Sequence, residues 1–218
     1  MAQFSPTLDE RTESIAAWLQ EHVREVAIIA TVVVVLAGGV FAYLRMSAAT
    51  ERNAEQAFFG AQALRQGADP TQAEAELAKV ASQYRGTAGG TQAAMVVAQL
   101  RYDAGKYDEG LKALEELRKG GVSDEFAASV EALIAAGYEG QGKFAEAAAA
   151  YQSAAGKARF EADRMSYRAD AARVLAAGGQ VAEAVKLWQS IADDPTSPLA
   201  DEARVRLGEL TVTPAGKS

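Results

Sequence analysis

The stretch GKYDEG, from Gly105 to Gly110, holds side chains that could bind phosphate or transfer protons. A glycine followed by a lysine ends the phosphate-binding loop of nucleotide-binding proteins, and adjacent carboxylates such as Asp108 and Glu109 can act as acid and base. The stretch lacks the upstream glycine and the following serine or threonine of such a loop, and it joins two predicted helices. Asp108 and Glu109 open the second of these helices, where negative charge offsets the helix dipole. We therefore expect the stretch to have a structural role.

The composition also argues against other reactive sites. The chain of 218 residues has no cysteine and one histidine, His22, which leaves little basis for a zinc site or a Ser-His-Asp triad. The net charge is −7 and no polybasic run occurs, so nothing indicates a nucleic-acid surface. We expect a non-enzymatic protein with no catalytic residue, cofactor, metal site, nucleic-acid partner or small-molecule substrate.

One segment near the N-terminus is apolar enough to cross a membrane. Residues 26–44, VAIIATVVVVLAGGVFAYL, form a run of 19 residues without a charge. A helix of this length spans roughly 28 Å, which is close to the hydrocarbon thickness of a bilayer. We predict a transmembrane helix over residues 26–45. The alternatives are a buried core helix and a cleavable signal peptide, but the run is longer than an ordinary signal-peptide core and follows acidic residues.

Residues 1–25 are expected to form an amphipathic or juxtamembrane segment. At helical spacing, four residues of this segment and the first residue of the apolar run share one helical face: Ile15, Trp18, Leu19, His22 and Val26. Such a helix could lie on the membrane surface, or these residues could be the solvated first turns of the anchor helix. We expect His22 to be an interfacial side chain, because no other metal-type residue except common carboxylates accompanies it.

Small residues within the apolar run predict a contact with a second transmembrane helix. Gly38 and Ala42 form a small-xxx-small pair, with Gly39 beside them. Small side chains let two helices approach closely, so these three residues are the predicted contact. Arginines flank the run equally on both sides, so the positive-inside rule does not decide its orientation.

The stretch that begins at Gly105 recurs along the chain. GKYDEGLKALEEL, GKFAEAAAAYQSA and GQVAEAVKLWQSI begin at Gly105, Gly142 and Gly179, each 37 residues after the last. Small, bulky and apolar side chains follow at a spacing that puts all three on one face of a helix. The matching sets are Gly110, Ala147 and Ala184; Leu114, Tyr151 and Trp188; and Leu117, Ala154 and Ile191. An earlier copy holds Ala73, Leu77 and Val80, and a further column holds Ala61, Ala98, Ala135 and Ala172.

Each unit is therefore predicted to be two helices joined by a short turn. The columns resemble those of the tetratricopeptide repeat, with a period of 37 residues in place of 34. We predict an all-α protein in which a single N-terminal transmembrane helix precedes an α-solenoid of four tetratricopeptide-like helical hairpins. This repeat domain covers residues 46–210, including a capping helix over residues 199–210, and residues 211–218 form a flexible tail.

Gly110 occupies a position that is alanine in the later copies. Glycine inside a helix costs about 1 kcal/mol relative to alanine. If Gly110 is only a close-packing position, Gly110→Ala is expected to be tolerated or stabilising. A strong loss of folding would mean that the chain approaches too closely for any side chain.

Stacked helical pairs leave an extended surface that binds peptides or proteins. In this register the surface belongs to the first helix of each unit. The predicted protein-binding residues are Phe58, Gln62, Arg65, Met95, Gln99, Tyr102 and Arg173, with Ser129, Glu139 and Ser166 on the same side. The alternative for Phe58 and Met95 is that they are core residues packed on the next helix.

Residues 81–117, ASQYRGTAGGTQAAMVVAQLRYDAGKYDEGLKALEEL, preceded by an N-terminal anchor, resemble a bacterial family. That family comprises inner-membrane tetratricopeptide proteins that are ancillary subunits of the Sec translocon. The resemblance implies a cytoplasmic N-terminus, a periplasmic repeat domain, and partners among integral-membrane subunits and chaperones, with the anchor in lipid. The alternative is a structural accessory subunit of another membrane assembly, such as a photosynthetic, respiratory or secretion complex.

Overall fold

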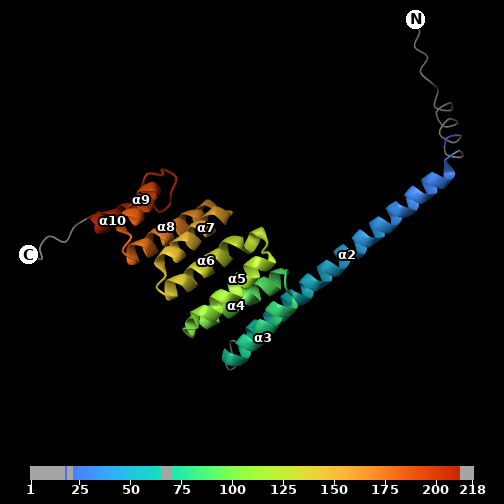
Figure 1. The fold of residues 1–218 in the computed structure, drawn as a ribbon, viewed down its shortest axis with the longest axis horizontal. Helices are drawn as coiled ribbons and strands as arrows, with labels where there is room; N and C mark the ends of the chain where they lie inside the picture. Colours follow the sequence, from blue (N-terminus) through green and yellow to red (C-terminus); the bar gives the residue numbers. More distant parts are fainter. Residues whose placement is uncertain (1–17, 19–21, 65–69, 212–218) are drawn as a thin grey trace, which may run out of the picture. The chain divides into compact units, whose positions relative to one another are not determined.

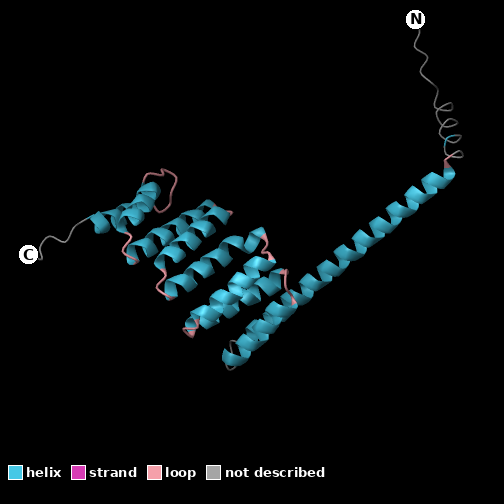
Figure 2. Ribbon diagram, in the orientation of Figure 1, coloured by secondary structure: helices cyan, strands magenta, loops and turns pink. Residues whose placement is uncertain are grey.

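A computed structural model describes residues 18, 22–64 and 70–211 of the chain. The chain divides into two compact units, Met1–Ala49 and Thr50–Ser218. Within the described residues all regular structure is helical, as the sequence predicts, and no strand occurs (Figure 2). The helices are α2 (Val23–Leu64), α3 (Pro70–Gln83), α4 (Ala88–Asp103), α5 (Tyr107–Gly120), α6 (Asp124–Gly140), α7 (Phe144–Lys157), α8 (Glu161–Ala177), α9 (Val181–Ala192) and α10 (Ala200–Thr211).

The described part of the first unit is mainly the N-terminal part of α2. This helix begins at Val23, three residues before the predicted span, and its most apolar window has a mean hydropathy of 2.5 with none of it buried. Apolar side chains including Ile29, Val34 and Phe41 are more than half exposed. By length and composition, α2 is the one helix in the described residues that could cross a membrane.

The second unit is a row of helical hairpins (Figure 1). Each hairpin has a first helix and a second helix, and the pairs are residues 50–64 of α2 with α3, α4 with α5, α6 with α7, and α8 with α9. Helix α10 packs on α9 and closes the row. The predicted glycines form the turns within three hairpins, because Gly105, Gly142 and Gly179 have φ angles of +74°, +72° and +80°. Side chains other than glycine rarely adopt such angles.

The predicted columns of small residues lie where neighbouring helices cross. Ala98, Ala135 and Ala172 are fully buried on the first helices, and Ala147 and Ala184 are fully buried on the second helices. The bulky column fills the space beside them, since Leu114, Tyr151 and Trp188 are at most 7% exposed. These side chains belong to one core that runs from α4 to α10. The predicted solenoid of tetratricopeptide-like hairpins is therefore confirmed.

Tyr102 fills the space that two glycines leave open. Its side chain, on α4, lies against Gly110 on α5 and Gly137 on α6. A Cβ atom at Gly110 would come closer than 3.0 Å to two ring carbons of Tyr102 and to 3.1 Å from the carbonyl oxygen of Ala98. Gly110 is therefore not a position that alanine could occupy freely: the glycine makes room for a ring from the neighbouring helix.

We predict that Gly110→Ala destabilises the protein. Overpacking of a well-packed core costs about 1–3 kcal/mol, which exceeds the roughly 1 kcal/mol that alanine gains in helix propensity. Urea unfolding of the full-length chain in detergent measures the change. Tyr102→Leu, which removes the ring, should recover part of the loss in the double variant, whereas Tyr102→Phe should not.

The matched control is Gly60→Ala in α2, where a Cβ atom would meet nothing within 4 Å. This change should leave stability unchanged or raise it by up to about 1 kcal/mol. Equal effects of the two alanine substitutions would contradict the packing argument.

Candidate protein-interaction surface

Most of the predicted binding residues lie outside the core on the first helices of successive units. Helices α4 and α6 pack directly against each other, and α6 and α8 are linked by the ion pair described below, so we treat the first helices as one layer. We call the solvent side of this layer the first-helix face. It is defined by the half-buried or exposed residues Gln62, Met95, Gln99, Ser129, Glu139, Ser166 and Arg173.

Two predicted binding residues belong instead to the core. Phe58 and Tyr102 are each 6% exposed, so the prediction that they contact a partner was wrong. Phe58 lies three residues before the buried Ala61, and Tyr102 lies four residues after the buried Ala98. Residues three or four apart share one side of a helix, so each aromatic ring points into the core beside its alanine.

The remaining predicted residues differ in how they are held. Met95 is half-buried and packs against the core, whereas Gln99 is exposed and donates a hydrogen bond from Nε2 to Asp103 Oδ1 at 2.9 Å. Gln62 is half-buried. Arg65 lies outside the described residues.

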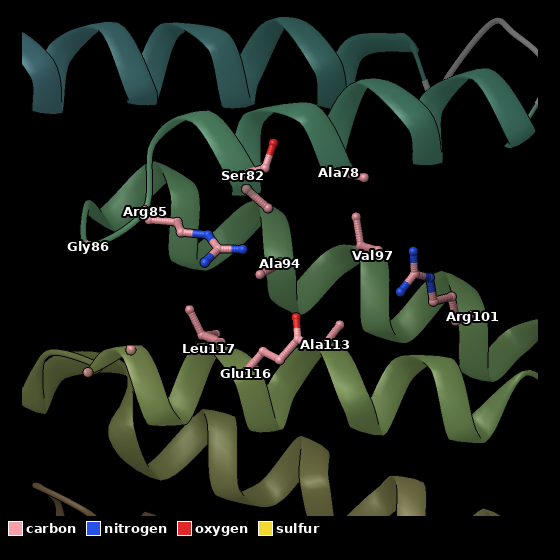
Figure 3. A pocket seen from close by; sticks show the side chains of 13 residues that line it. Ala78, Ser82, Arg85, Gly86, Ala94, Val97, Arg101, Ala113, Glu116 and Leu117 are labelled. Atoms are coloured by element: carbon pink, nitrogen blue, oxygen red, sulfur yellow. The ribbon is translucent and has the colours of Figure 1, made fainter.

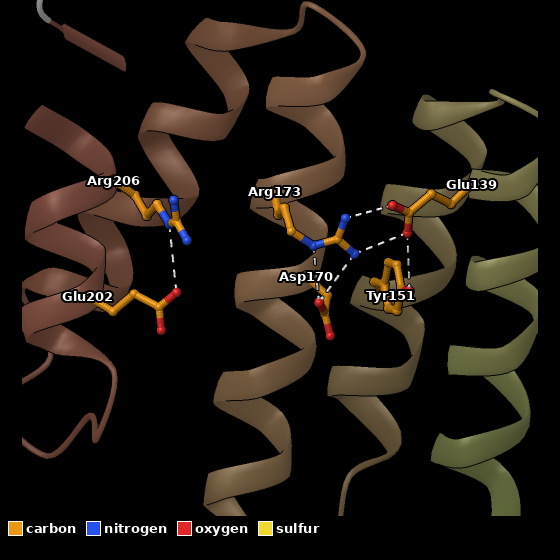
Figure 4. Close-up of polar contacts among 6 residues, drawn as sticks. All are labelled: Glu139, Tyr151, Asp170, Arg173, Glu202 and Arg206. Carbon is orange, nitrogen blue, oxygen red and sulfur yellow. Dashed lines mark hydrogen bonds and ion pairs between the residues drawn. The ribbon is translucent and has the colours of Figure 1, made fainter. Parts of the chain in front are cut away.

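Arg173 and Glu139 form a bidentate ion pair between adjacent first helices (Figure 4). Arg173 on α8 donates from Nη1 to Glu139 Oε1 at 2.6 Å and from Nη2 to Glu139 Oε2 at 3.0 Å. Arg173 also approaches Asp170 at 3.4 Å, and the Tyr151 hydroxyl lies 3.5 Å from Glu139 Oε2. Two parallel bonds fix the planar guanidinium in one orientation. The pair therefore joins α6 to α8 and presents a fixed charge pattern on the first-helix face.

The pKa values of this cluster follow from burial and from the ion pair. The hydrogen bond from Arg173 holds the pKa of Glu139 below its ordinary value, against the opposing effect of burial. Burial raises the pKa of Asp170, and the nearby carboxylates Glu139 and Glu202 add to this effect while Arg173 opposes it. Burial also raises the pKa of Tyr151 to about 12, so its hydroxyl stays protonated and can donate to Glu139.

A pocket of about 240 Å³ opens beside this cluster, between α8 and α10. The buried ring of Trp188 and the aliphatic Leu210 form part of its wall, and Asp170, Arg206 and Glu209 supply charge. Arg206 donates to Glu209 at 3.0 Å and lies 3.7 Å from Glu202. A pocket with an apolar wall and fixed ionic groups can accept a side chain of a partner protein.

Sequence reasoning missed the contribution of α10 to this pocket. Asp170 and Arg173 are three residues apart, and Glu202 and Arg206 are four apart, so each pair shares one side of its helix. That spacing, visible in the sequence, indicates a charged side on each of the two helices. It could not show that α8 and α10 bring the two faces to the same pocket.

Only some of the residues singled out near the N-terminus belong to the part of the chain that the structure describes. Trp18 and His22 stack with ring centroids 4.8 Å apart, while Ile15 and Leu19 lie outside the described residues. Gly38 and Gly39 are exposed, and a Cβ atom at either position would meet nothing within 4 Å. The helix contact expected for these two glycines and Ala42 stays a prediction. In the described parts of the chain, no group of three or more histidine, cysteine or acidic side chains could hold a metal ion.

We predict that the ion pair makes stability depend on pH. A carboxyl whose pKa is lowered by folding contributes stability above its unfolded pKa, and the contribution is lost as the pH falls through the folded value. Glu139→Gln should therefore lower the free energy of unfolding by about 1 kcal/mol at neutral pH. The difference from the unmodified chain should shrink as the pH falls below 4.5, the ordinary value for this carboxyl.

Urea unfolding across this pH range tests the prediction, with Glu116→Gln as a control that removes an exposed carboxyl on α5. A difference between Glu139→Gln and the unmodified chain that stays constant down to strongly acidic pH would contradict an ionic role for Glu139.

Comparison with known proteins agrees with this architecture. Nearly identical TPR-like repeats from Podosopora anserina, described as a kinesin light chain, superpose with a TM-score of 0.55 at 18% identity, covering 71% of this chain and 83% of that one. A single-substitution variant of the same repeats gives a TM-score of 0.56 at 19% identity over the same shares of the two chains. These likenesses establish the fold. No curated protein sequence matches the chain.

The model of the tetratricopeptide repeat-like domain matches residues 16–128 and 58–171, which together cover more than half of the chain. The match includes all of α4 to α7 and the first part of α8, so it contains Glu139 and ends two residues before Arg173. The chain therefore belongs to the tetratricopeptide repeat-like domain family.

Proposed function

We propose that the protein is a non-enzymatic, membrane-anchored scaffold whose first-helix face binds partner proteins. The observation that carries this proposal is the pocket between α8 and α10, where ionic side chains are held in place beside an apolar wall. Domains built from tetratricopeptide-like repeats generally bind proteins through surfaces of this kind. Gln99, Met95 and Arg173 extend the binding surface along the row of first helices.

The anchor in this proposal is the N-terminal part of α2. Its uncharged run is long enough to cross a bilayer, and its side chains are exposed in the described unit. Gly38, Gly39 and Ala42 would contact a transmembrane helix of the partner complex, since small residues permit close approach. We place the anchor in a bacterial inner membrane, with the N-terminus in the cytoplasm and the repeats in the periplasm.

By resemblance, the complex is the Sec translocon together with periplasmic chaperones, and the protein is an accessory subunit of it. Residues 81–117 and the order of anchor and repeats support this assignment. A different membrane assembly would use the same surface and the same anchor, and co-purification distinguishes the two.

We predict that translocon subunits co-purify with the full-length protein after extraction in mild detergent. Arg173→Ala should lower their recovery by about tenfold, because loss of a charge-assisted contact at an interface costs roughly 1.4 kcal/mol or more. The matched control is Arg164→Ala, which removes an exposed arginine from the same helix but lies outside the pocket. Quantitative mass spectrometry of the eluates measures both.

Two results would change this proposal, one by removing the binding function and the other by replacing the partner. Elution of the protein alone as a monomer would contradict the binding function. Recovery of another complex with the same dependence on Arg173 would keep the scaffold function and replace the translocon as the partner.

We predict that the protein resists extraction by alkaline carbonate and that protease added to spheroplasts digests the repeat domain. A transmembrane helix holds a protein in the bilayer when peripheral proteins are released. Digestion only after the inner membrane is broken would overturn the periplasmic placement. Release by carbonate would overturn the anchor.

A further inference from the structure

A second pocket lies away from the first-helix face, where the C-terminal ends of two second helices flank α6. It has a volume of about 470 Å³, and three cations line it: Arg118 at the end of α5, Lys157 at the end of α7, and Arg159 just beyond α7. Val122 and Ala127 form part of its apolar wall. The pocket is basic, although the chain as a whole carries a net charge of −7.

A buried carboxylate holds two of these cations in place. Glu131 on α6 has a side chain that is 4% exposed, and it pairs with Lys157 and, at 3.3 Å, with Nη1 of Arg118. The side chains of Arg118 and Lys157 are each 43% exposed. A guanidinium has five N–H donors and an ammonium has three, so each cation keeps donors for a further acceptor. We call Arg118, Glu131 and Lys157 the charged triad.

The repeat shows that the fold does not require the charged triad. One period of 37 residues earlier, the same three positions are Ala81, Ala94 and Gly120. Those residues line the equivalent pocket between α3, α4 and α5, and Figure 3 shows Ala94 on α4 within it. The corresponding junction of the preceding unit is therefore built without a charge at any of these three positions. Burying a carboxylate costs several kcal/mol before its partners compensate, so the stability of this junction alone does not explain why Glu131 replaces alanine here.

The charged side chains that line the pocket sum to a net charge of +1. Arg118, Lys157 and Arg159 contribute three, while Glu131 and Asp124 remove two. Asp124 is in the first turn of α6, where the helix dipole already stabilises it. Arg159 is exposed and forms no ion pair with any residue in the described parts of the chain. An added anion would meet preoriented donors and an unpaired cation.

We propose that this pocket binds a carboxylate side chain from an acidic segment of a partner protein. A carboxylate accepts two parallel hydrogen bonds from an arginine, and the apolar wall can hold an aliphatic neighbour of the acidic residue. The net negative charge of the chain opposes long polyanions such as nucleic acids, which bind along extended basic surfaces. The site is separate from the pocket of the first-helix face, so it goes beyond the proposed function and does not depend on it.

The test uses the full-length protein in nanodiscs of phosphatidylcholine and a fluorescent peptide in which glutamate alternates with leucine. We expect saturable binding of this peptide at low ionic strength and much weaker binding of a peptide with glutamine in place of glutamate. Arg159→Ala should weaken binding about tenfold, the loss expected for a charge-assisted hydrogen bond. Lys112→Ala, which removes an exposed lysine on α5 outside the pocket, should leave binding unchanged.

A triple variant isolates the charged triad. Arg118→Ala, Glu131→Ala and Lys157→Gly together install the residues of the preceding unit, so the junction is expected to fold with an unchanged helical circular dichroism spectrum. It should lose binding of the acidic peptide. This variant, Arg159→Ala and Lys112→Ala each lower the net charge by one, so non-specific attraction of the peptide falls equally in all three.

Several outcomes would overturn the proposal. These are equal loss of binding in Lys112→Ala and Arg159→Ala, retained binding in the folded triple variant, and equal binding of the glutamine peptide. Binding of phosphatidylglycerol vesicles that depends on Arg159, without binding of the acidic peptide, would show a lipid site instead. Arg173→Ala should retain peptide binding, which separates this test from the test of the first-helix face.

Discussion

The close approach of neighbouring helices at small side chains is the constraint on which the rest of the structure depends. Ala98, Ala135 and Ala172 are fully buried where first helices cross their neighbours. Larger side chains there would force the helices apart and open the core beside them. Gly110 shows the limit of this constraint, because the ring of Tyr102 takes the space that a methyl group would need. Once these crossings are fixed, the side of the row on which each exposed residue lies follows from its place on the helix.

The helical hairpins share one backbone arrangement, and the charged side chains are what differ from one unit to the next. The Glu139–Arg173 pair joins two first helices on one side of the row, while the charged triad joins the ends of two second helices elsewhere. Both sites place ionic groups beside an open pocket, and in both a neighbour fixes their orientation. The repeat supplies the same backbone several times, and the side chains that differ between copies are the ones that can recognise different partners.

The period of 37 residues was enough to predict the hairpins, their glycine turns and most of the core, because these features are local to each copy. The solvent side of the first helices was harder to predict. Each first helix contacts helices on two sides, so its buried stripe is wide and includes positions such as Phe58 and Tyr102. The position of these two residues within the repeat had predicted that they face solvent. The charged triad comes from three helices, so no single segment reveals it. A glutamate at position 131, in a column that begins with Ala57 and Ala94, was the visible signal.

That column has a consequence for how the chain folds. Repeats of similar shape can stack out of order, since each offers nearly the same surface to its neighbours. If α6 packed against α3 in place of α5, Glu131 would face Ala81 where Arg118 belongs. The buried carboxylate would keep its pair with Lys157 but lose its second cation, so its burial would be less well compensated. The glutamate that shapes a pocket in the native protein is therefore best compensated when the repeats stack in their native order, whether or not a ligand is present.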